Sequence, residues 1–238
     1  MSTRLDLGGI AVDVVLKNIK NIHLSVYPPT GSVRISAPLR MNIETIRVFA
    51  ISKLGWIKRQ QEKFRNQERE TPREYLQRES HYVWGRRYLL TVAEGHQAPS
   101  VDLKHSQILL HVRPGTDDLK KEAIIEEWYR QQIKMAAPPI IAKWEPVMGV
   151  KVAHFFVQRM KTRWGSCNPK TRSIRLNTEL AKKPAECFEY IVVHEMAHLL
   201  APTHNARFVH IMDQFMPKWK FYKDQLNRLP VSHDDWEY

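Results

Sequence analysis

The chain has 238 residues, an apolar share of 43% and a formal net charge of +12. This length allows one large domain or two small ones, and the apolar content is that of an ordinary packed core. Two cysteines, Cys167 and Cys187, are too few for a disulfide framework and suit a reducing compartment. No secretory leader pattern and no apolar run of membrane-spanning length is seen, so we expect a cytoplasmic protein with no membrane contact.

Strand patterns dominate the first half of the chain. Period-two apolar spacing predicts strands at 10–15, 19–27, 33–37, 81–93 and 108–112. Pro28–Gly31 reads as the turn of a hairpin or meander. Between Met41 and Phe64 the apolar spacing changes to three or four residues, which predicts a helix with Asn42 as its N-cap. The polar stretch 60–80 is expected to be the solvated end of that helix and a linker.

The turn signal Pro114–Asp117 divides the chain into a β-rich region with one helix, 1–115, and a second domain, 116–238. A long amphipathic helix is predicted to follow the turn, and Pro138–Pro139 to interrupt or kink it. Its expected apolar face consists of Leu119, Ala123, Ile124, Trp128 and Ile133. Later elements are expected as strands at 152–158 and 173–177, and as helices from Pro184 to about residue 200 and at 205–215. No internal repeat is visible.

The segment His194-Glu195-Met196-Ala197-His198 is an H-E-x-x-H motif within a predicted helix. Two histidines four residues apart lie on the same face of a helix, so both imidazoles can reach one ion. Zinc lowers the pKa of a bound water toward ~7, and Glu195 can take the proton of that water. The motif therefore predicts a zinc hydrolase with Glu195 as general base.

A third ligand is expected just after this helix. Pro202 forces the chain to turn, and His204 follows six residues after His198. A turn followed by a histidine can bring a third imidazole back to the same ion. The alternatives are that His204 caps the next helix or lies at the surface, or that His210 is the ligand.

Three further residues near the motif have open roles. Cys187 lies about 10 Å along the helix from His194, too far to share the ion, and is expected to be buried packing. Cys167, expected in a loop, could be a ligand, a sensor thiol or a structural residue. Glu179 could accept a hydrogen bond from a histidine that binds the metal and so orient its ring, or it could be a solvated or helix-terminal charge.

A basic segment precedes the metal-site helix: residues 151–183 contain nine Lys or Arg and one acid, Glu179. If the segment folds against the helix, its charges would attract an anionic substrate. Arg163 and Arg175 are candidate substrate contacts, and Trp164 could stack on a base. The alternative is a solvated basic hairpin with Trp164 in the core.

The pattern Arg163-Trp164-Gly165-Ser166-Cys167, Ile174-Arg175-Leu176-Asn177 and the H-E-x-x-H segment with His204 resembles the YgjP-like metal-dependent hydrolases, relatives of the SprT-type zincins. The resemblance covers about 152–219 closely and the N-terminal strands more loosely, with Trp56 matching the tryptophan of a family helix. It departs at Asn205 and Val209, where the family has Ser and Trp.

The resemblance implies an α+β fold with a zincin-like catalytic domain, preceded by a β-rich region. It also implies one zinc ion bound by His194, His198 and His204, with Glu195 as general base. The resemblance does not determine the substrate, and we expect a metallopeptidase that acts on a peptide or protein. A first alternative is a magnesium-dependent nucleoside triphosphate pyrophosphatase acting on a UTP-type nucleotide. A second is a SprT-like module that binds nucleic acid through its basic surface.

Overall fold

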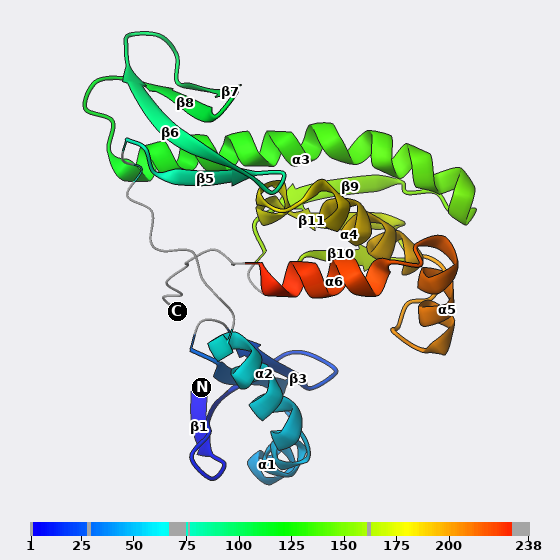
Figure 1. Ribbon diagram of the computed structural model, residues 1–238. Helices are drawn as coiled ribbons and strands as arrows, with labels where there is room; N and C mark the ends of the chain where they lie inside the picture. Colours follow the sequence, from blue (N-terminus) through cyan, green and yellow to red (C-terminus); the bar gives the residue numbers. More distant parts are fainter. Residues whose placement is uncertain (1, 28–29, 67–74, 76, 161–162, 230–238) are drawn as a thin grey trace. The chain divides into compact units, whose positions relative to one another are not determined.

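The structure, a computed structural model, describes residues 2–27, 30–66, 75, 77–160 and 163–229 (Figure 1). The chain forms two compact units, one within residues 1–69 and the other within 70–232, and each has its own buried apolar cluster. The sequence-based division at residues 115 and 116 falls inside the second unit. The expected start of the catalytic domain at residue 116 stays a prediction.

The first unit contains a four-stranded sheet. Its strands are β1 (Ser2–Asp6), β2 (Ala11–Lys17), β3 (His23–Tyr27) and β4 (Ser32–Pro38), in the order β1-β2-β4-β3. The central pair, β2 and β4, is parallel, and the outer pairs are antiparallel. β1 was not expected, because Leu5 is its one large apolar residue. Of the expected turn, Pro28 and Pro29 lie outside the described residues, and the Gly31 N–H donates to the Tyr27 carbonyl at 2.8 Å.

Two helices follow where one was expected, α1 (Ile43–Ser52) and α2 (Leu54–Asn66). The N-cap is confirmed, since the Asn42 side chain accepts a hydrogen bond from the Thr45 N–H at 2.8 Å. The break falls at Lys53, the C-cap of α1. There the Ser52 hydroxyl donates to the Phe49 carbonyl, which competes with continuation of the helix.

The second unit opens with another four-stranded sheet. Its strands are β5 (Ser80–Val83), β6 (Arg86–Glu94), β7 (Ser100–Lys104) and β8 (Gln107–Val112), in the order β5-β6-β8-β7. A single strand expected over 81–93 is a hairpin instead, because Trp84 and Gly85 both adopt positive φ (49° and 78°) and reverse the chain. β7 was missed, since as an edge strand it has no buried face.

The two four-stranded sheets share one topology. Across each sheet, the strands lie side by side in the order first, second, fourth, third, where the numbers give their order along the chain. The central pair is parallel and the outer pairs are antiparallel. In each, the fourth strand leads into a helix. The chain therefore contains a structural repeat that its sequence does not reveal.

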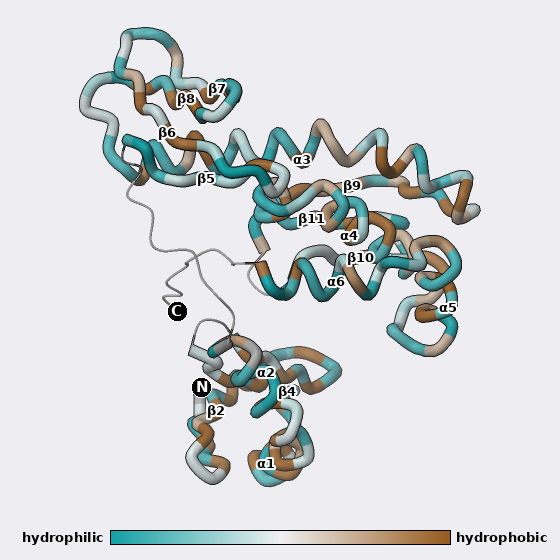
Figure 2. Tube along the Cα trace, in the orientation of Figure 1, coloured by the Kyte–Doolittle hydropathy of each residue, from teal (hydrophilic) through white to brown (hydrophobic). Residues whose placement is uncertain are grey.

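The long helix α3 (Asp118–Met148) is continuous across Pro138 and Pro139, so the prolines do not interrupt it. Both prolines are exposed, so the carbonyls that lose their helical partners can bond to water. Asp117 caps its start through the Lys120 N–H, and Figure 2 shows hydrophobic and hydrophilic residues alternating along it. The buried face differs in part from the expected one: Ile133 is buried as expected, but Leu119 is 79% exposed, and Ile125 and Tyr129, which were not expected on this face, are buried.

The remaining elements build the motif-bearing region. They are β9 (His154–Gln158), β10 (Gly165–Asn168), β11 (Ser173–Asn177), the 3-10 helix η1 (Thr178–Lys182), α4 (Ala185–Ala197), α5 (Ala206–Phe215) and α6 (Trp219–Arg228). The three strands form a sheet in the order β10-β11-β9, and α4 contacts β10, β11, α3, α5 and α6. α6 was not expected, because six of its ten residues have charged or amide side chains. The expected mixed α+β class is confirmed. None of the described helices is long and apolar enough to cross a membrane.

Candidate metal centre

The helix α4 carries the H-E-x-x-H motif. Pro184 stands at its N-cap, where the missing N–H leaves no helical bond unmade. The side chains of Val192, Val193 and Met196 are fully buried and fix the helix against its neighbours. Glu195 shares this buried environment and is 4% exposed.

His198 ends α4 rather than lying inside it. The helix was expected to reach Leu200, but it stops at Ala197 and His198 is its C-cap. The His198 Nδ1 lies 3.1 Å from the Ala201 carbonyl oxygen. Because a carbonyl only accepts hydrogen bonds, Nδ1 carries the proton and Nε2 keeps a free lone pair. This bond leaves Nε2 available to a metal ion.

The turn after α4 returns His204 to the other two histidines. Nε2 of His204 lies 3.0 Å from Nε2 of His194. One ring nitrogen from each of His194, His198 and His204 lies within 4.8 Å of the others. Asn205 caps α5 by accepting a hydrogen bond from the Phe208 N–H at 3.0 Å, which fixes where the loop ends.

This arrangement fits a zinc ion. Tetrahedral zinc, with zinc–nitrogen distances of about 2.1 Å, holds nitrogen ligands roughly 3.4 Å apart. Burial lowers the pKa of all three imidazoles, and for His194, where the neighbouring His198 and His204 add to the effect, it lowers the pKa to about 3. Imidazole must be neutral to bind a metal. The three rings are therefore neutral at physiological pH.

Phe208 packs against all three rings, a contact that the sequence analysis missed. Its centroid lies 4.9 Å from that of His194 and 4.7 Å from those of His198 and His204. It is 1% exposed. An aromatic residue in the first turn of the helix after His204 was the one available signal.

The Glu195 carboxylate is buried. Burial raises the pKa of Glu195 to about 8, and the positive charge of Arg163 opposes that rise. Its Oε2 atom is buried and has no hydrogen-bond partner among the described residues. A buried carboxyl group of raised pKa is suited to accepting and returning a proton near neutral pH.

Of the three basic-segment candidates, Arg163 is the one whose charge acts on Glu195. Trp164 packs against the core, and the Lys183 ammonium lies 5.8 Å from the centre of its ring. Arg175 pairs with Ser166 on β10 and with Phe156 on β9.

The face of the sheet on which Arg175 lies follows from strand alternation. A Cβ at Gly165 would point at Glu195, and Gly165 pairs with Leu176. Because successive residues of a strand point to opposite faces, Arg175 lies on the other face of the sheet. The structure therefore does not bring Arg175 next to Glu195.

The cysteines and His210 take no part in the histidine cluster. Cys187 is fully buried, as expected, and its thiol donates to the Gln225 Oε1 on α6 at 3.4 Å. Cys167 lies in β10 rather than in a loop. Burial, with a smaller contribution from Glu195, raises the pKa of its thiol to about 11. His210 is exposed on α5.

Asn177, at the end of β11, fixes the segment before β10. Its side-chain amide donates to the carbonyls of Met160 and Arg163, at 2.7 and 2.8 Å. Its Oδ1 accepts from the backbone N–H groups of Met160 and Glu179. The residue is 4% exposed. Asn177 was expected only as part of the motif that carries the family resemblance, and these hydrogen bonds were not predicted.

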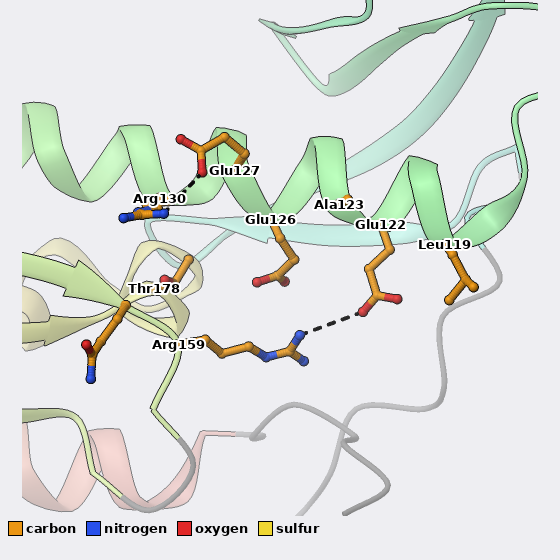
Figure 3. A pocket seen from close by; sticks show the side chains of 9 residues that line it. Leu119, Glu122, Ala123, Glu126, Glu127, Arg130, Arg159 and Thr178 are labelled. Atoms are coloured by element: carbon orange, nitrogen blue, oxygen red, sulfur yellow. Dashed lines mark ion pairs between the residues drawn. The ribbon is translucent and has the colours of Figure 1, made fainter.

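A pocket of about 560 Å³ lies between α3 and the residues that end β9 and begin η1 (Figure 3). In it Arg159 reaches Glu122, with Nη1 and Oε1 3.8 Å apart. Glu179, in the first turn of η1, is buried and forms an ion pair with Lys182, in which Oε1 and Nζ are 2.6 Å apart. Glu179 is thus a helix-terminal charge, but not a solvated one. The pocket is separate from the metal centre, because no histidine of the cluster lines it.

Comparison with known proteins assigns the chain to a family. No curated protein matches the chain. Among solved structures, the metallopeptidase zymogen of Pyrococcus abyssi abylysin is 21% identical, with 40% of this chain and 99% of that one covered, at a TM-score of 0.36. The zymogen of Methanocaldococcus jannaschii jannalysin is 18% identical, with 38% and 92% covered, at a TM-score of 0.34. The family model "YgjP-like, metallopeptidase domain" matches residues 20–229, and the chain belongs to this family of metal-dependent hydrolases.

Proposed function

We propose that this chain is a zinc-dependent metallopeptidase in which His194, His198 and His204 hold one zinc ion and Glu195 is the general base. The observation that carries the proposal is the convergence of three neutral imidazoles within 4.8 Å, next in sequence to a buried carboxylate. Family membership supports a metal and a peptide or protein substrate.

Different residues have different roles in the proposed hydrolysis. When bound, zinc supplies the Lewis acidity that makes water nucleophilic near neutral pH. Glu195 accepts a proton from the attacking water and then donates it to the leaving amine nitrogen. Its burial keeps the proton affinity of the carboxylate high enough for both steps. Arg163 and Trp164 are the proposed substrate contacts, since both precede β10, the strand against which Glu195 packs.

The test is cleavage of a peptide mixture by zinc-loaded protein, with products identified by mass spectrometry. Glu195→Gln should reduce cleavage about 100- to 10,000-fold, because general acid–base catalysis contributes about that much. Zinc content should stay at one ion per chain, since Glu195 is not a ligand. Cleavage that persists in Glu195→Gln would contradict the assignment of the base.

Nucleotide hydrolysis and nucleic-acid binding receive no specific support from the described residues. The first would need several cationic groups around one triphosphate, and Arg175 lies on the face of the sheet opposite the one that meets Glu195. Diphosphate release from UTP with magnesium, in the absence of any peptide cleavage, would reverse this preference.

A further inference from the structure

We propose that Gly165 is a positioning residue for Glu195: the missing side chain at residue 165 leaves the space that the Glu195 side chain occupies. The catalytic consequence rests on the proposed function. The contact itself does not, because it is a matter of packing between β10 and α4 that exists whatever the substrate.

The three atoms nearest to the position of a Cβ at residue 165 all belong to the side chain of Glu195. A Cβ added at residue 165 would lie 2.5 Å from Oε1, 2.7 Å from Cγ and 2.9 Å from Cδ of Glu195. Carbon atoms in contact are normally about 3.5–4.0 Å apart. Alanine at residue 165 therefore requires Glu195 to leave its present position or β10 to move away from α4.

The backbone does not by itself demand glycine at this position. Gly165 is absent from the residues with positive φ, whereas Gly149 and Gly115, for example, have φ of 64° and 73°. Alanine adopts the backbone conformation of a strand without strain. The need for glycine at residue 165 is therefore a need for space.

Neither partner can move freely. Gly165 is held by its pairing with Leu176 on β11, and the preceding carbonyl, of Trp164, accepts the Asn177 N–H at 3.0 Å. Glu195 is 4% exposed and lies on a helix anchored by fully buried side chains. A methyl group at residue 165 would press on two well-fixed elements.

No hydrogen bond among the described residues holds Oε2 of Glu195 in place. That oxygen is buried and without a hydrogen-bond partner in the described part of the chain. We infer that the shape of the surroundings helps to set the position of the carboxylate, and a Cβ at residue 165 would lie 2.5 Å from its Oε1. Residue 165 therefore influences the position of the general base although glycine has no side-chain polar group.

The first test measures thermal unfolding of metal-free protein for Gly165→Ala, Glu195→Ala and the double variant. We expect Gly165→Ala to lower the melting temperature by about 2 to 8 °C in the wild-type background, as overpacking does. With Glu195 truncated, the same substitution should lower it by less than about 1 °C, because the clashing atoms are gone. Equal lowering in both backgrounds, or none in either, would overturn the proposal.

The second test measures peptide cleavage by zinc-loaded protein. Gly165→Ala should lower kcat about 10- to 100-fold, as displacement of a catalytic group by about 1 Å does, with KM within about twofold and zinc content unchanged. The matched control is Gly95→Ala, since Gly95 has open space around it and no positive φ. Unchanged kcat in Gly165→Ala would overturn the catalytic consequence. A wild-type protein that cleaves no peptide would count against the proposed function, while the unfolding measurements would still decide whether the contact exists.

Discussion

The ring of Phe208 stacks on the imidazole of His198, with the two centroids 4.7 Å apart and the planes 30° apart. The same ring meets His194 and His204 edge-on. One buried apolar side chain thus contacts all three imidazoles. We therefore expect the geometry of the histidine cluster to depend on Phe208, a residue that cannot itself bind a metal.

Truncating Phe208 should damage both stability and metal binding. Phe208→Ala is expected to lower the free energy of unfolding by about 3–5 kcal/mol, because it leaves a large cavity in the core. Zinc affinity, measured by competition with a chelator, should fall because the imidazoles lose their common support. The matched control is Phe221→Ala, since Phe221 is 63% exposed. Wild-type zinc affinity in a folded Phe208→Ala protein would show that the ring does not organise the cluster.

Removing the third histidine should reduce zinc binding sharply. We expect His204→Ala to lower zinc affinity by at least about 100-fold, since even residues that only support metal ligands contribute about 10- to 100-fold. Zinc added to metal-free wild-type protein should raise its melting temperature, because the ion binds the folded state. That rise should be much smaller in His204→Ala.

The control for His204→Ala is His210→Ala, because His210 is exposed on α5 and outside the cluster. Elemental analysis should find about one zinc per chain in this variant, as in the wild type. Equal zinc content in His204→Ala and His210→Ala would contradict the three-histidine site.

Asn177→Ala should loosen the segment that carries Arg163. The variant loses the hydrogen bonds to Met160 and Arg163 and leaves their carbonyls to find other partners. At about 0.5–1.5 kcal/mol for each of the four hydrogen bonds that the Asn177 side chain makes, we expect the free energy of unfolding to fall by roughly 2–6 kcal/mol, measured with urea. Asn168→Ala is the control: it removes two hydrogen bonds, from the backbone N–H groups of Lys170 and Thr171, at an exposed position of β10, and should therefore lower the free energy of unfolding less than Asn177→Ala.

Glu195 should give the metal-free protein a characteristic pH dependence. Burial raises its pKa in the folded state to about 8, above the value of about 4.5 expected in the unfolded chain. Its contribution to stability is therefore fully present below pH 4.5 and is lost as the pH rises through about 8. Between pH 5 and 9, the free energy of unfolding of the wild type should fall relative to that of Glu195→Gln by a few kcal/mol. Parallel pH profiles of the two proteins would contradict the burial of an ionisable carboxyl.

The histidine spacing and the helix caps could be predicted from the sequence. Asn42, Asp117 and Asn205 cap helices through hydrogen bonds to backbone groups three residues away. His194 and His198 are related by one turn of helix. Such relationships depend on local backbone geometry alone, so a short stretch of sequence contains all that is needed to state them.

Other features could not be predicted, because they join residues that are distant in sequence. The exposure of Leu119 and the burial of Ile125 and Tyr129 depend on what packs against α3. The shared topology of the two sheets depends on which strands pair, and edge strands such as β7 leave almost no apolar pattern.

The sequence by itself determined that a helix presents His194, Glu195 and His198 together, followed by a turn and His204, because helix periodicity and turn formation are local. Only the tertiary structure decided that Gly165 leaves room for Glu195, that Phe208 lies against the three imidazoles and that Arg175 faces away. These depend on the packing of β10, α4 and α5, in which the shape of each side chain matters and not only its type.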